Sequence, residues 1–469
     1  MKKYKTDWLA SKPVFYNEKT LKISHNINDV IDYSDINFHP EGLNNYLDFG
    51  YSVFQQTPLK NVKFLRHSSE IWVENNKLKI IEKPDPVIKW FEDNLGYKDE
   101  GEVLELIKKK VRDWEKSTEG DIVIPLSGGY DSRLLAYFIK DRSRLKAFTY
   151  GISNRQEDSY EVVNAKEICK RLGISWRQIF LGDQHKYFDE WDQHFGISTH
   201  AHGMYHFEFY TKMNEYLKGA EYFLSGIIGD AWAGSIVTKK INSPKDLALL
   251  GYTHGMTADS KHSKYPSSSM NEMSGFFIKN KDYLKDERYR LVTSMRLKLI
   301  LLSYLFTVPE VFSFKPWSPY LDMEVALSML SIDPGRRKNR SWQKEFFEKI
   351  NLDVDISTFS VNKTNNLNHQ AMQKIKLKPL NVELLCEVIE EDYVNWINKI
   401  LLDTPLLYKI IPKIKSSNIN PWLIKKGTEG LNRIGLKDKV MEAYCAYLTL
   451  KPIENVLYRR NKYLKENKS

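Results

Sequence analysis

Residues 127–132 read Ser-Gly-Gly-Tyr-Asp-Ser, which places two glycines, two hydroxyls and a carboxylate within six positions. The apolar run Ile122–Leu126 precedes this loop and the helix-like run Arg133–Ile139 follows it. Glycines let a chain turn tightly, and the first N–H groups of a helix have no partner inside that helix. The pattern therefore predicts an anion site, at which Ser127 and Ser132 would add hydroxyl donors.

Asp131 is the unusual member of this loop, because a carboxylate repels a bound phosphate unless a divalent cation lies between them. The loop has no lysine, so it is not a Walker A motif, and it is not Gly-x-Gly-x-x-Gly either. Residues 224–235 show a similar pattern, because the end of a candidate strand is followed there by glycines and by Asp230. Asp230 could simply cap the next helix. Paired with Asp131, it predicts an oxygen-rich Mg²⁺ site.

The elements around both loops alternate between strand and helix. The candidate strands are Asp121–Leu126, Leu145–Tyr150, Trp176–Leu181 and Glu221–Ser225, and helical patterns fill 131–140, 159–172 and 204–218. This alternation predicts an α/β fold with a doubly wound parallel sheet. Ligands of such sheets bind at the carboxyl ends of the strands, where both loops would lie. Asp158 and Ser159 can cap the second helix, and Gly173 can end it.

The flanking regions predict a further division of the chain. Residues 1–95 look β-rich, with candidate strands at 62–65, 71–74 and 77–81 and a turn at Asn75-Asn76, and they precede a helix near 102–116. The polar stretch 235–287, which includes Pro266–Ser269, is either a mobile lid over a nucleotide or a plain insertion. Helical patterns follow at 288–307, 322–331, 341–350, 381–401 and 436–449. We expect domains at 1–95, 96–287 and 288–469.

Composition narrows the class of protein. The chain of 469 residues has three widely spaced cysteines, which form neither a disulfide framework nor a Cys-x-x-Cys pair and fit a cytoplasmic protein. The N-terminus lacks the apolar core of a signal peptide, and the longest apolar stretch, about 299–308, predicts a buried helix rather than a membrane span. The net charge of +10 comes without a nucleic-acid-binding signature, so nucleic acid is not the expected partner.

Both loops resemble motifs of the asparagine synthetase family, whose relatives include β-lactam synthetases and lasso-peptide cyclases. Residues 127–132 resemble the Ser-Gly-Gly-x-Asp-Ser loop of ATP pyrophosphatases, and residues 225–235 resemble the family's Ser/Thr-Gly-x-Gly-x-Asp-Glu-x-x-Gly-Gly. Further segments resemble the family's adenine-holding strand, an acidic position, its Pro-Phe-Leu-Asp and the end of its N-terminal domain: Ala147–Gly151, Glu161, Ser318–Asp322 and Asn45–Tyr51. The resemblance covers about residues 40–370.

The resemblance implies the fold, the cofactors and the roles of individual residues. It implies the adenine-nucleotide α-hydrolase type of sheet, with ATP split between its α and β phosphates in the presence of Mg²⁺. Asp131 and Asp230 would act in catalysis as metal ligands, and Lys363 would stabilise charge during acyl transfer, with Lys338 or Lys344 as alternatives. The implied ATP-binding residues are Leu126, Ser127, Gly128, Gly129, Asp131, Ser132, Tyr150, Ser225 and Gly226.

Departures from the family narrow the expected reaction. Ile227 and Ala231 replace two acids of the asparagine-forming members, so we do not expect aspartate as the substrate. The glutamate that β-lactam synthetases use would fall around Lys315, and this chain lacks it. The chain begins Met1-Lys2 and has no cysteine before Cys169, so the resemblance implies no glutamine hydrolysis. The nitrogen would come from ammonia, from a separate glutaminase or from an amine.

Three function hypotheses follow. The first is a ligase that adenylates a carboxylate and transfers it to ammonia or an amine; the carboxylate could belong to a small molecule, a sugar acid or a peptide. The second is adenylation of a tRNA base by a related ATP pyrophosphatase, and the third is an ATP-binding protein that has lost catalysis. His200, His202 and His206 form a cluster that could contact a substrate, pack in the core or bind zinc, although no fourth zinc ligand is evident.

Overall fold

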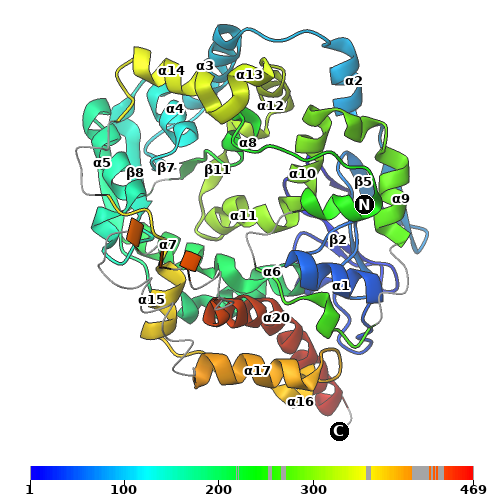
Figure 1. Ribbon diagram of the computed structural model, residues 1–469. Helices are drawn as coiled ribbons and strands as arrows, with labels where there is room; N and C mark the ends of the chain where they lie inside the picture. Colours follow the sequence, from blue (N-terminus) through cyan, green and yellow to red (C-terminus); the bar gives the residue numbers. More distant parts are fainter. Residues whose placement is uncertain are drawn as a thin grey trace.

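The computed structural model describes residues 2–217, 219, 221–251, 256–265, 271–354, 361–403, 422–423, 426–427, 429–430 and 438–467. A central sheet with flanking helices, N-terminal antiparallel strands and a set of C-terminal helices make up this part of the chain (Figure 1). One hydrophobic cluster contains buried side chains from all three regions, from Trp8 through Val123 to Leu457. The three regions therefore share a core.

The central sheet has five parallel strands in the order β11-β10-β7-β8-β9. The strands are β7 (Ile122–Pro125), β8 (Leu145–Tyr150), β9 (Ser175–Ile179), β10 (Tyr222–Leu224) and β11 (Lys315–Trp317). The four strands expected from the sequence are confirmed to within two residues at each end. Strand order reverses between β7 and β10, which is the switch point at which such sheets bind ligands.

The edge strand β11 was not predicted from the sequence. It has only three residues, and Pro316 at its centre cannot donate a backbone hydrogen bond. Proline is tolerated at this position because β11 is an edge strand that pairs with β10 alone. The interior strand β7 has the opposite character, since Ile122, Val123 and Ile124 are completely buried. A continuous apolar run of this kind is typical of a strand that is covered on both faces.

Helices connect and cover the strands. They are α3 (Glu100–Lys116), α4 (Tyr130–Phe138), α5 (Tyr160–Leu172), α6 (Phe188–Phe195), α7 (Tyr205–Asn214) and α8 (Gly229–Ala233). As expected, α5 ends at Gly173, which adopts a left-handed φ of 67°. Ser159 does occupy the N-cap position of α5, but its hydroxyl makes no cap bond and instead accepts the N–H of Ser153 at 3.0 Å. The predicted capping by this side chain is therefore wrong.

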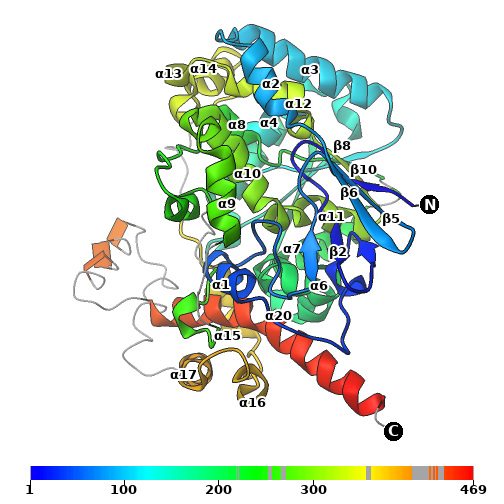
Figure 2. The same cartoon turned by 90° about the vertical axis from the view of Figure 1, so that its right-hand side faces the viewer.

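The N-terminal region contains two antiparallel sheets, in the orders β1-β5-β6 and β3-β2-β4 (Figure 2). Their strands are β1 (Tyr4–Lys5), β2 (Phe15–Asn17), β3 (Ile23–Ser24), β4 (Val62–Phe64), β5 (Ser69–Glu74) and β6 (Lys77–Glu82). The predicted hairpin is confirmed, and Asn75 and Asn76 at its turn both have positive φ. Two helices were not expected in this region, namely α1 (Pro40–Phe49) and α2 (Pro86–Asp93).

The polar stretch 235–287 includes a helix, α9 (Asn271–Asn280), where the sequence suggested a lid or a plain insertion. The N–H groups of Glu272 and Met273 donate to the carboxylate of Glu41 on α1, and the ring of Phe276 lies 5.7 Å from that of Phe54. This helix therefore packs against the N-terminal region. Residues 266–269 of the suggested lid lie outside the described residues.

The C-terminal helices mostly confirm the expected periodicity. They are α10 (Glu287–Leu302), α11 (Tyr304–Val311), α12 (Met323–Leu330), α13 (Pro334–Arg337), α14 (Ser341–Lys349), α15 (Leu367–Lys374), α16 (Val382–Leu385), α17 (Glu391–Leu402) and α20 (Lys439–Glu466). The single helices expected over 288–307 and 381–401 are each divided in two, and the last helix is longer than predicted. The proposed domain limits at residues 95 and 287 remain predictions.

One helical stretch, Glu287–Val311, has the length and apolar composition of a membrane span. In the structure 67% of its most apolar window is buried inside the protein. Core helices meet the same criterion. The stretch 299–308, predicted to be a buried helix, is buried over 299–301 and at 303 and 308 and partly buried elsewhere.

Candidate active site at the switch point

The loop after β7 has the geometry of an open helix N-terminus. Gly129 is the N-cap of α4 and has no side chain with which to cap it, so the first N–H groups of the helix are available to a ligand. Within the loop, the N–H of Ser127 donates to the hydroxyl of Ser132 at 3.3 Å, and the N–H of Gly129 donates to the hydroxyl of Ser127 at 3.2 Å. The two predicted hydroxyls thus lie on either side of the turn.

Gly128 holds the loop close to α5. A Cβ atom on this residue would lie 2.8 Å from Cβ of Asn164 and 3.0 Å from the Tyr160 ring, distances that real Cβ atoms rarely adopt. The buried guanidinium of Arg133 donates to the carbonyl of Gly128 at 2.8 Å and to that of Leu352 at 3.0 Å. The requirement for glycine at this position is therefore a requirement for space.

The second loop packs directly on the first. A Cβ on Gly226 would lie 3.0 Å from the backbone nitrogen of Ser132, and one on Gly229 would lie 3.0 Å from Cβ of Asp131. Tyr320, from the segment that resembles Pro-Phe-Leu-Asp, fills the remaining space and donates its hydroxyl to the carbonyl of Asp131 at 3.2 Å. The structure therefore brings together three segments that the sequence placed about 100 residues apart.

The negative charges of Asp131 and Asp230 interact across the two loops. Burial and the negative charge of Asp230 raise the pKa of Asp131 to about 7, while Asp230 itself is exposed and accepts the Ser235 hydroxyl at 2.8 Å. A cation between the two carboxylates would relieve this repulsion, so the pair fits Mg²⁺. The described residues contain no group of three or more acidic, histidine or cysteine side chains that could hold a metal. Phosphate oxygens would have to complete the coordination.

Two cationic side chains near these carboxylates were missed by the sequence reasoning. Nη1 of Arg340 lies 3.7 Å from Oδ2 of Asp131, and its guanidinium is 4.9 Å from the centre of the Tyr130 ring. The buried ammonium of Lys298 on α10 interacts with the charge of Asp230, which opposes the lowering of the Lys298 pKa by burial. Arg340 belongs to the basic run 336–340, whose only sequence signal was its charge.

The segment that carries Arg340 is docked onto the second loop. The carbonyl of Arg337 occupies the space beside Gly234, and the indole N–H of Trp342 donates to the carbonyl of Ala233 at 3.0 Å. Gln343 donates to Oδ1 of Asp131 at 3.3 Å. Asn339 and Arg340 both adopt left-handed backbone conformations, with φ of 55° and 58°. Such strain in non-glycine residues is concentrated at functional sites.

The three candidate lysines have different surroundings. Nζ of Lys363 lies 5.0 Å from the centre of the Tyr160 ring, the same ring that packs against Gly128. Its side chain is exposed beside the loop, and its catalytic role stays a prediction. Lys338 and Lys344 are also exposed, and Lys344 lies 3.7 Å from Glu348.

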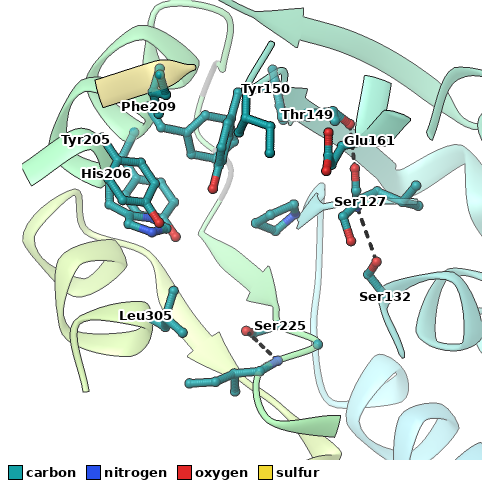
Figure 3. A pocket seen from close by; sticks show the side chains of 18 of the residues that line it. Ser127, Ser132, Thr149, Tyr150, Glu161, Tyr205, His206, Phe209, Ser225 and Leu305 are labelled. Atoms are coloured by element: carbon teal, nitrogen blue, oxygen red, sulfur yellow. Dashed lines mark hydrogen bonds between the residues drawn. The ribbon is translucent and has the colours of Figure 1, made fainter. Parts of the chain in front are cut away.

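A cavity of about 450 Å³ opens above the two loops (Figure 3). Every residue in the predicted ATP-binding set lines it except Gly128 and Gly129, which belong to the loop itself. Thr149 ties the strand ends together, because its hydroxyl donates to the carbonyl of Leu126 at 2.5 Å and accepts the Trp176 indole N–H at 3.1 Å. The other lining residues are Pro125, Phe148, Thr149, Ile152, Glu161, His202, Tyr205, His206, Phe209, Tyr210, Phe223, Ile227, Leu305, Asn365, Leu367 and Asn368.

Glu161 lies at the Ser127 side of the cavity (Figure 3). Its Oε2 is buried without a hydrogen-bond partner among the described residues, and burial raises the pKa of this carboxyl. A carboxyl group in this position is suited to accept hydrogen bonds from a ligand. This placement agrees with the acidic position that the resemblance implied.

The three histidines of the predicted cluster have different surroundings. His200 is buried against Gly50 of the N-terminal region, whereas His202 and His206 line the cavity. No metal-ligand group is found among the described residues, so zinc gains no support.

The departures from the asparagine-forming pattern lie at or beside the cavity. Ile227 lines the cavity, whereas Ala231 is buried on α8 and is not among the lining residues. Lys315 instead lies at the surface, where its ammonium pairs with Glu221 at 2.7 Å.

One family model matches the part of the chain that contains both glycine loops. A comparison with curated proteins found no match. A solved structure, an NH3-dependent NAD synthetase from Campylobacter jejuni subsp. jejuni NCTC 11168 in complex with the nitrate ion, is 17% identical over 54% of this chain and 96% of that chain, with a TM-score of 0.22. Residues 102–232 match the family model described as asparagine synthase, and this stretch contains β7, both glycine loops and the two aspartates. The sequence resemblance and the family model thus point to the same family over residues 102–232.

Proposed function

We propose that the protein is an ATP-dependent ligase that adenylates a carboxylate and then forms an amide with ammonia or an amine. The observation that carries this proposal is the contact between the two glycine loops at the switch point, where the charges of Asp131 and Asp230 interact. Both loops lie in the stretch that matches the asparagine synthase family model. We also propose a cytoplasmic location, because the three cysteines are widely spaced in the sequence and include no Cys-x-x-Cys pair.

In the first step, a carboxylate oxygen of the acceptor attacks the α-phosphorus of ATP, and the bond to the β-phosphate oxygen breaks. The N-terminus of α4 and the hydroxyls of Ser127 and Ser132 hold the phosphates in line. Asp131 and Asp230 would hold Mg²⁺, which supplies positive charge to the departing pyrophosphate. Arg340, whose guanidinium lies 3.7 Å from the Asp131 carboxylate, would add further positive charge to the phosphate site.

In the second step, the nitrogen nucleophile attacks the acyl carbon, AMP leaves and the nitrogen loses a proton. The exposed ammonium of Lys363 is proposed to stabilise the negative charge that develops during this exchange. Ile227 and Ala231 offer no carboxylate for an ammonium ion. This favours an acceptor other than aspartate, in a small molecule, a sugar acid or a peptide.

Pyrophosphate release tests the proposal. The protein is incubated with ATP, Mg²⁺ and pools of carboxylates and amines, and pyrophosphate is measured. Asp131→Asn keeps the shape of the side chain but removes its charge, and should lower release about 100-fold. Asp113→Asn on the exposed face of α3 is the matched control. Equal turnover by the Asp131 variant would exclude this mechanism.

Ile227 and Ala231 also favour a second candidate, an ATP-binding protein without turnover. Calorimetric titration with ATP separates the two, because a catalytic site should bind ATP more tightly when Mg²⁺ is present. Binding that is indifferent to Mg²⁺ and yields no pyrophosphate would support the second candidate.

A further inference from the structure

The cavity extends beyond the residues expected to hold ATP, which come from the loops after β7 and β10 and from the end of β8. A further part of its wall, here called the aromatic chamber, is lined by Tyr205, His206, Phe209 and Tyr210 on α7, Ile227 after β10 and Leu305 on α11. In Figure 3, Tyr205, His206 and Phe209 lie on the opposite side of the cavity from Ser127 and Ser132. The chamber is therefore separate from the phosphate loop, although one cavity contains both.

The walls of the chamber are largely apolar. The ring centre of Phe209 lies 5.1 Å from that of Tyr150 and 5.3 Å from that of Tyr210. No lysine or arginine is found among the described residues that line the cavity, and its acidic lining residues are Asp131 and Glu161 at the ATP end. An ammonium group or a second carboxylate in the chamber would be buried without an ionic partner, which is costly. The chamber therefore suits an uncharged, flat ring.

His206 is the polar group of this chamber that has no use within the protein. It is only 6% exposed, and among the described residues neither of its ring nitrogens has a hydrogen-bond partner. Its ring lies 4.2 Å from that of Tyr205 and 4.8 Å from that of Tyr304. The Tyr205 hydroxyl interacts with the hydroxyls of Tyr150 and Tyr304 instead. A buried polar group that is left unpaired normally awaits a ligand or a water molecule.

The imidazole of His206 is neutral at physiological pH, because burial and the neighbouring His202 lower its pKa to about 3. A neutral imidazole offers one N–H donor and one nitrogen acceptor. It therefore has nothing to offer a charged group beyond a hydrogen bond. A hydroxyl group, which can both donate and accept, is a matching partner for either ring nitrogen.

The chamber also lies beside the place where the α-phosphate of ATP would react. Ser225 and Ile227 line the cavity at the carboxyl end of β10, and β10 pairs with β7, whose end carries the phosphate loop. A molecule in the chamber can therefore direct a carboxylate past Ser225 toward phosphates held by that loop. The aromatic body of such a molecule would remain on the α7 side.

We infer that the aromatic chamber holds the acceptor of the ligase, and that this acceptor is a carboxylate with an uncharged aromatic body whose hydroxyl group hydrogen-bonds to His206. The inference rests on the proposed function and names its substrate class. The carboxylate oxygen attacks the α-phosphorus and pyrophosphate leaves, while the aromatic walls contact the ring. His206 selects a ring that carries a hydroxyl over one that does not.

Exchange of labelled pyrophosphate into ATP tests the inference, because it reports adenylation without the nitrogen donor. Three matched acids are compared in the presence of Mg²⁺: para-hydroxyphenylpropionate, phenylpropionate, which lacks the hydroxyl, and tyrosine, which adds an ammonium group. Aspartate and glucuronate represent the other classes of acceptor. We expect the first acid to be the best, phenylpropionate to have a kcat/KM about tenfold lower, and tyrosine, aspartate and glucuronate to be weaker by about tenfold or more.

Two variants locate the acceptor in the chamber. His206→Leu should accept the two propionates equally, whereas His206→Gln, which retains a donor and an acceptor, should keep part of the preference for the hydroxyl. Leu305→Trp should fill the chamber and raise the KM for para-hydroxyphenylpropionate about tenfold or more, with the affinity for ATP unchanged. Leu402→Trp, on the exposed end of α17, adds the same ring away from the cavity and is the control.

Each outcome has a separate meaning. If the wild type neither binds ATP nor exchanges pyrophosphate with any acid, the proposed function fails together with this inference. If it binds ATP but exchanges pyrophosphate only with tyrosine, aspartate or glucuronate, or with no acid of the panel, the aromatic class of acceptor is wrong and the use of ATP stands. If His206→Leu keeps the full preference for the hydroxyl, His206 is not the group that recognises it. His206→Gln replaces the leucine variant in this comparison if the latter does not fold.

Discussion

At the scale of single residues, Arg340 adds a cation to the proposed phosphate site that the sequence did not predict. Its guanidinium lies beside Asp131, although the sequence placed it in a basic run with no assigned role. Arginine suits phosphate because its planar donors bind two oxygens at once. Arg340 and its neighbour Asn339 both have positive φ values. Their segment is held against α8 by the hydrogen bond from Trp342 to the carbonyl of Ala233.

We predict that Arg340→Met weakens ATP binding about tenfold or more, because a cation next to the phosphates is lost. The variant should also lose affinity for pyrophosphate, which calorimetry can measure directly. Lys349→Met, at the exposed end of α14, removes the same charge and serves as the control. Unchanged pyrophosphate affinity in the Arg340 variant would show that Arg340 does not bind the phosphates and serves only to hold its own segment in place.

His206 also predicts a pH dependence of stability. Its pKa is about 3 in the folded protein against an ordinary value of 6.5, so the folded state resists a proton that the unfolded chain accepts. The resulting stability is present above about pH 6.5 and is lost as the pH falls toward 3. His206→Gln should reduce the slope of unfolding free energy against pH by up to about 1.4 kcal/mol per pH unit in this window. Urea unfolding at a series of pH values measures it, and identical slopes in both proteins contradict it.

At the scale of elements, the unit formed by β7, its loop and α4 depends on contact with α5. The loop lies against α5 only because Gly128 has no side chain. The strand, the glycines and the helix could be predicted from a dozen residues, since apolar run, turn and helical periodicity are local signals. Which helix the loop touches depends on sheet order and could not be predicted.

We predict that Gly128→Ala displaces the loop from α5, because the new methyl group would lie 2.8 Å from Cβ of Asn164. The KM for ATP should rise about tenfold or more, since the phosphate donors would no longer be aligned. Steady-state kinetics measure the effect, with thermal unfolding to confirm that the variant is folded. Gly96→Ala, at a position with open space around it, should leave KM unchanged. An unaltered KM in the Gly128 variant would show that the loop tolerates the methyl group.

At the scale of the whole molecule, the N-terminal region is joined to the rest by buried polar contacts. Arg296 on α10 makes a two-pronged ion pair with Asp85 at 2.6 and 2.8 Å, with both side chains less than 10% exposed. The indole N–H of Trp8 donates to the carbonyl of Leu321 at 2.8 Å, next to the site segment that carries Tyr320. These contacts predict that the N-terminal region and the sheet unfold together.

We predict that Arg296→Met destabilises the protein by about 3–5 kcal/mol, because the carboxylate of Asp85 is left buried without its partner. Combining it with Asp85→Asn should recover much of the loss. Glu310→Gln, which breaks the exposed pair with Lys12, should cost at most about 1 kcal/mol. Chemical denaturation followed by both fluorescence and circular dichroism should show one transition. Two separate transitions in the wild type would show that the regions unfold independently.

The sequence by itself determined the local parts of this protein. The loops at 127–132 and 225–230, the strands β7 to β10 and most C-terminal helices could be predicted from glycine spacing and hydrophobic period, because these signals are local. Only the tertiary structure decided that Arg340 and Tyr320 surround Asp131, that the three-residue strand β11 completes the sheet, and that His206 lies unpaired among tyrosines. Those features arise from packing between segments distant in the chain, for which no local pattern carries a signal.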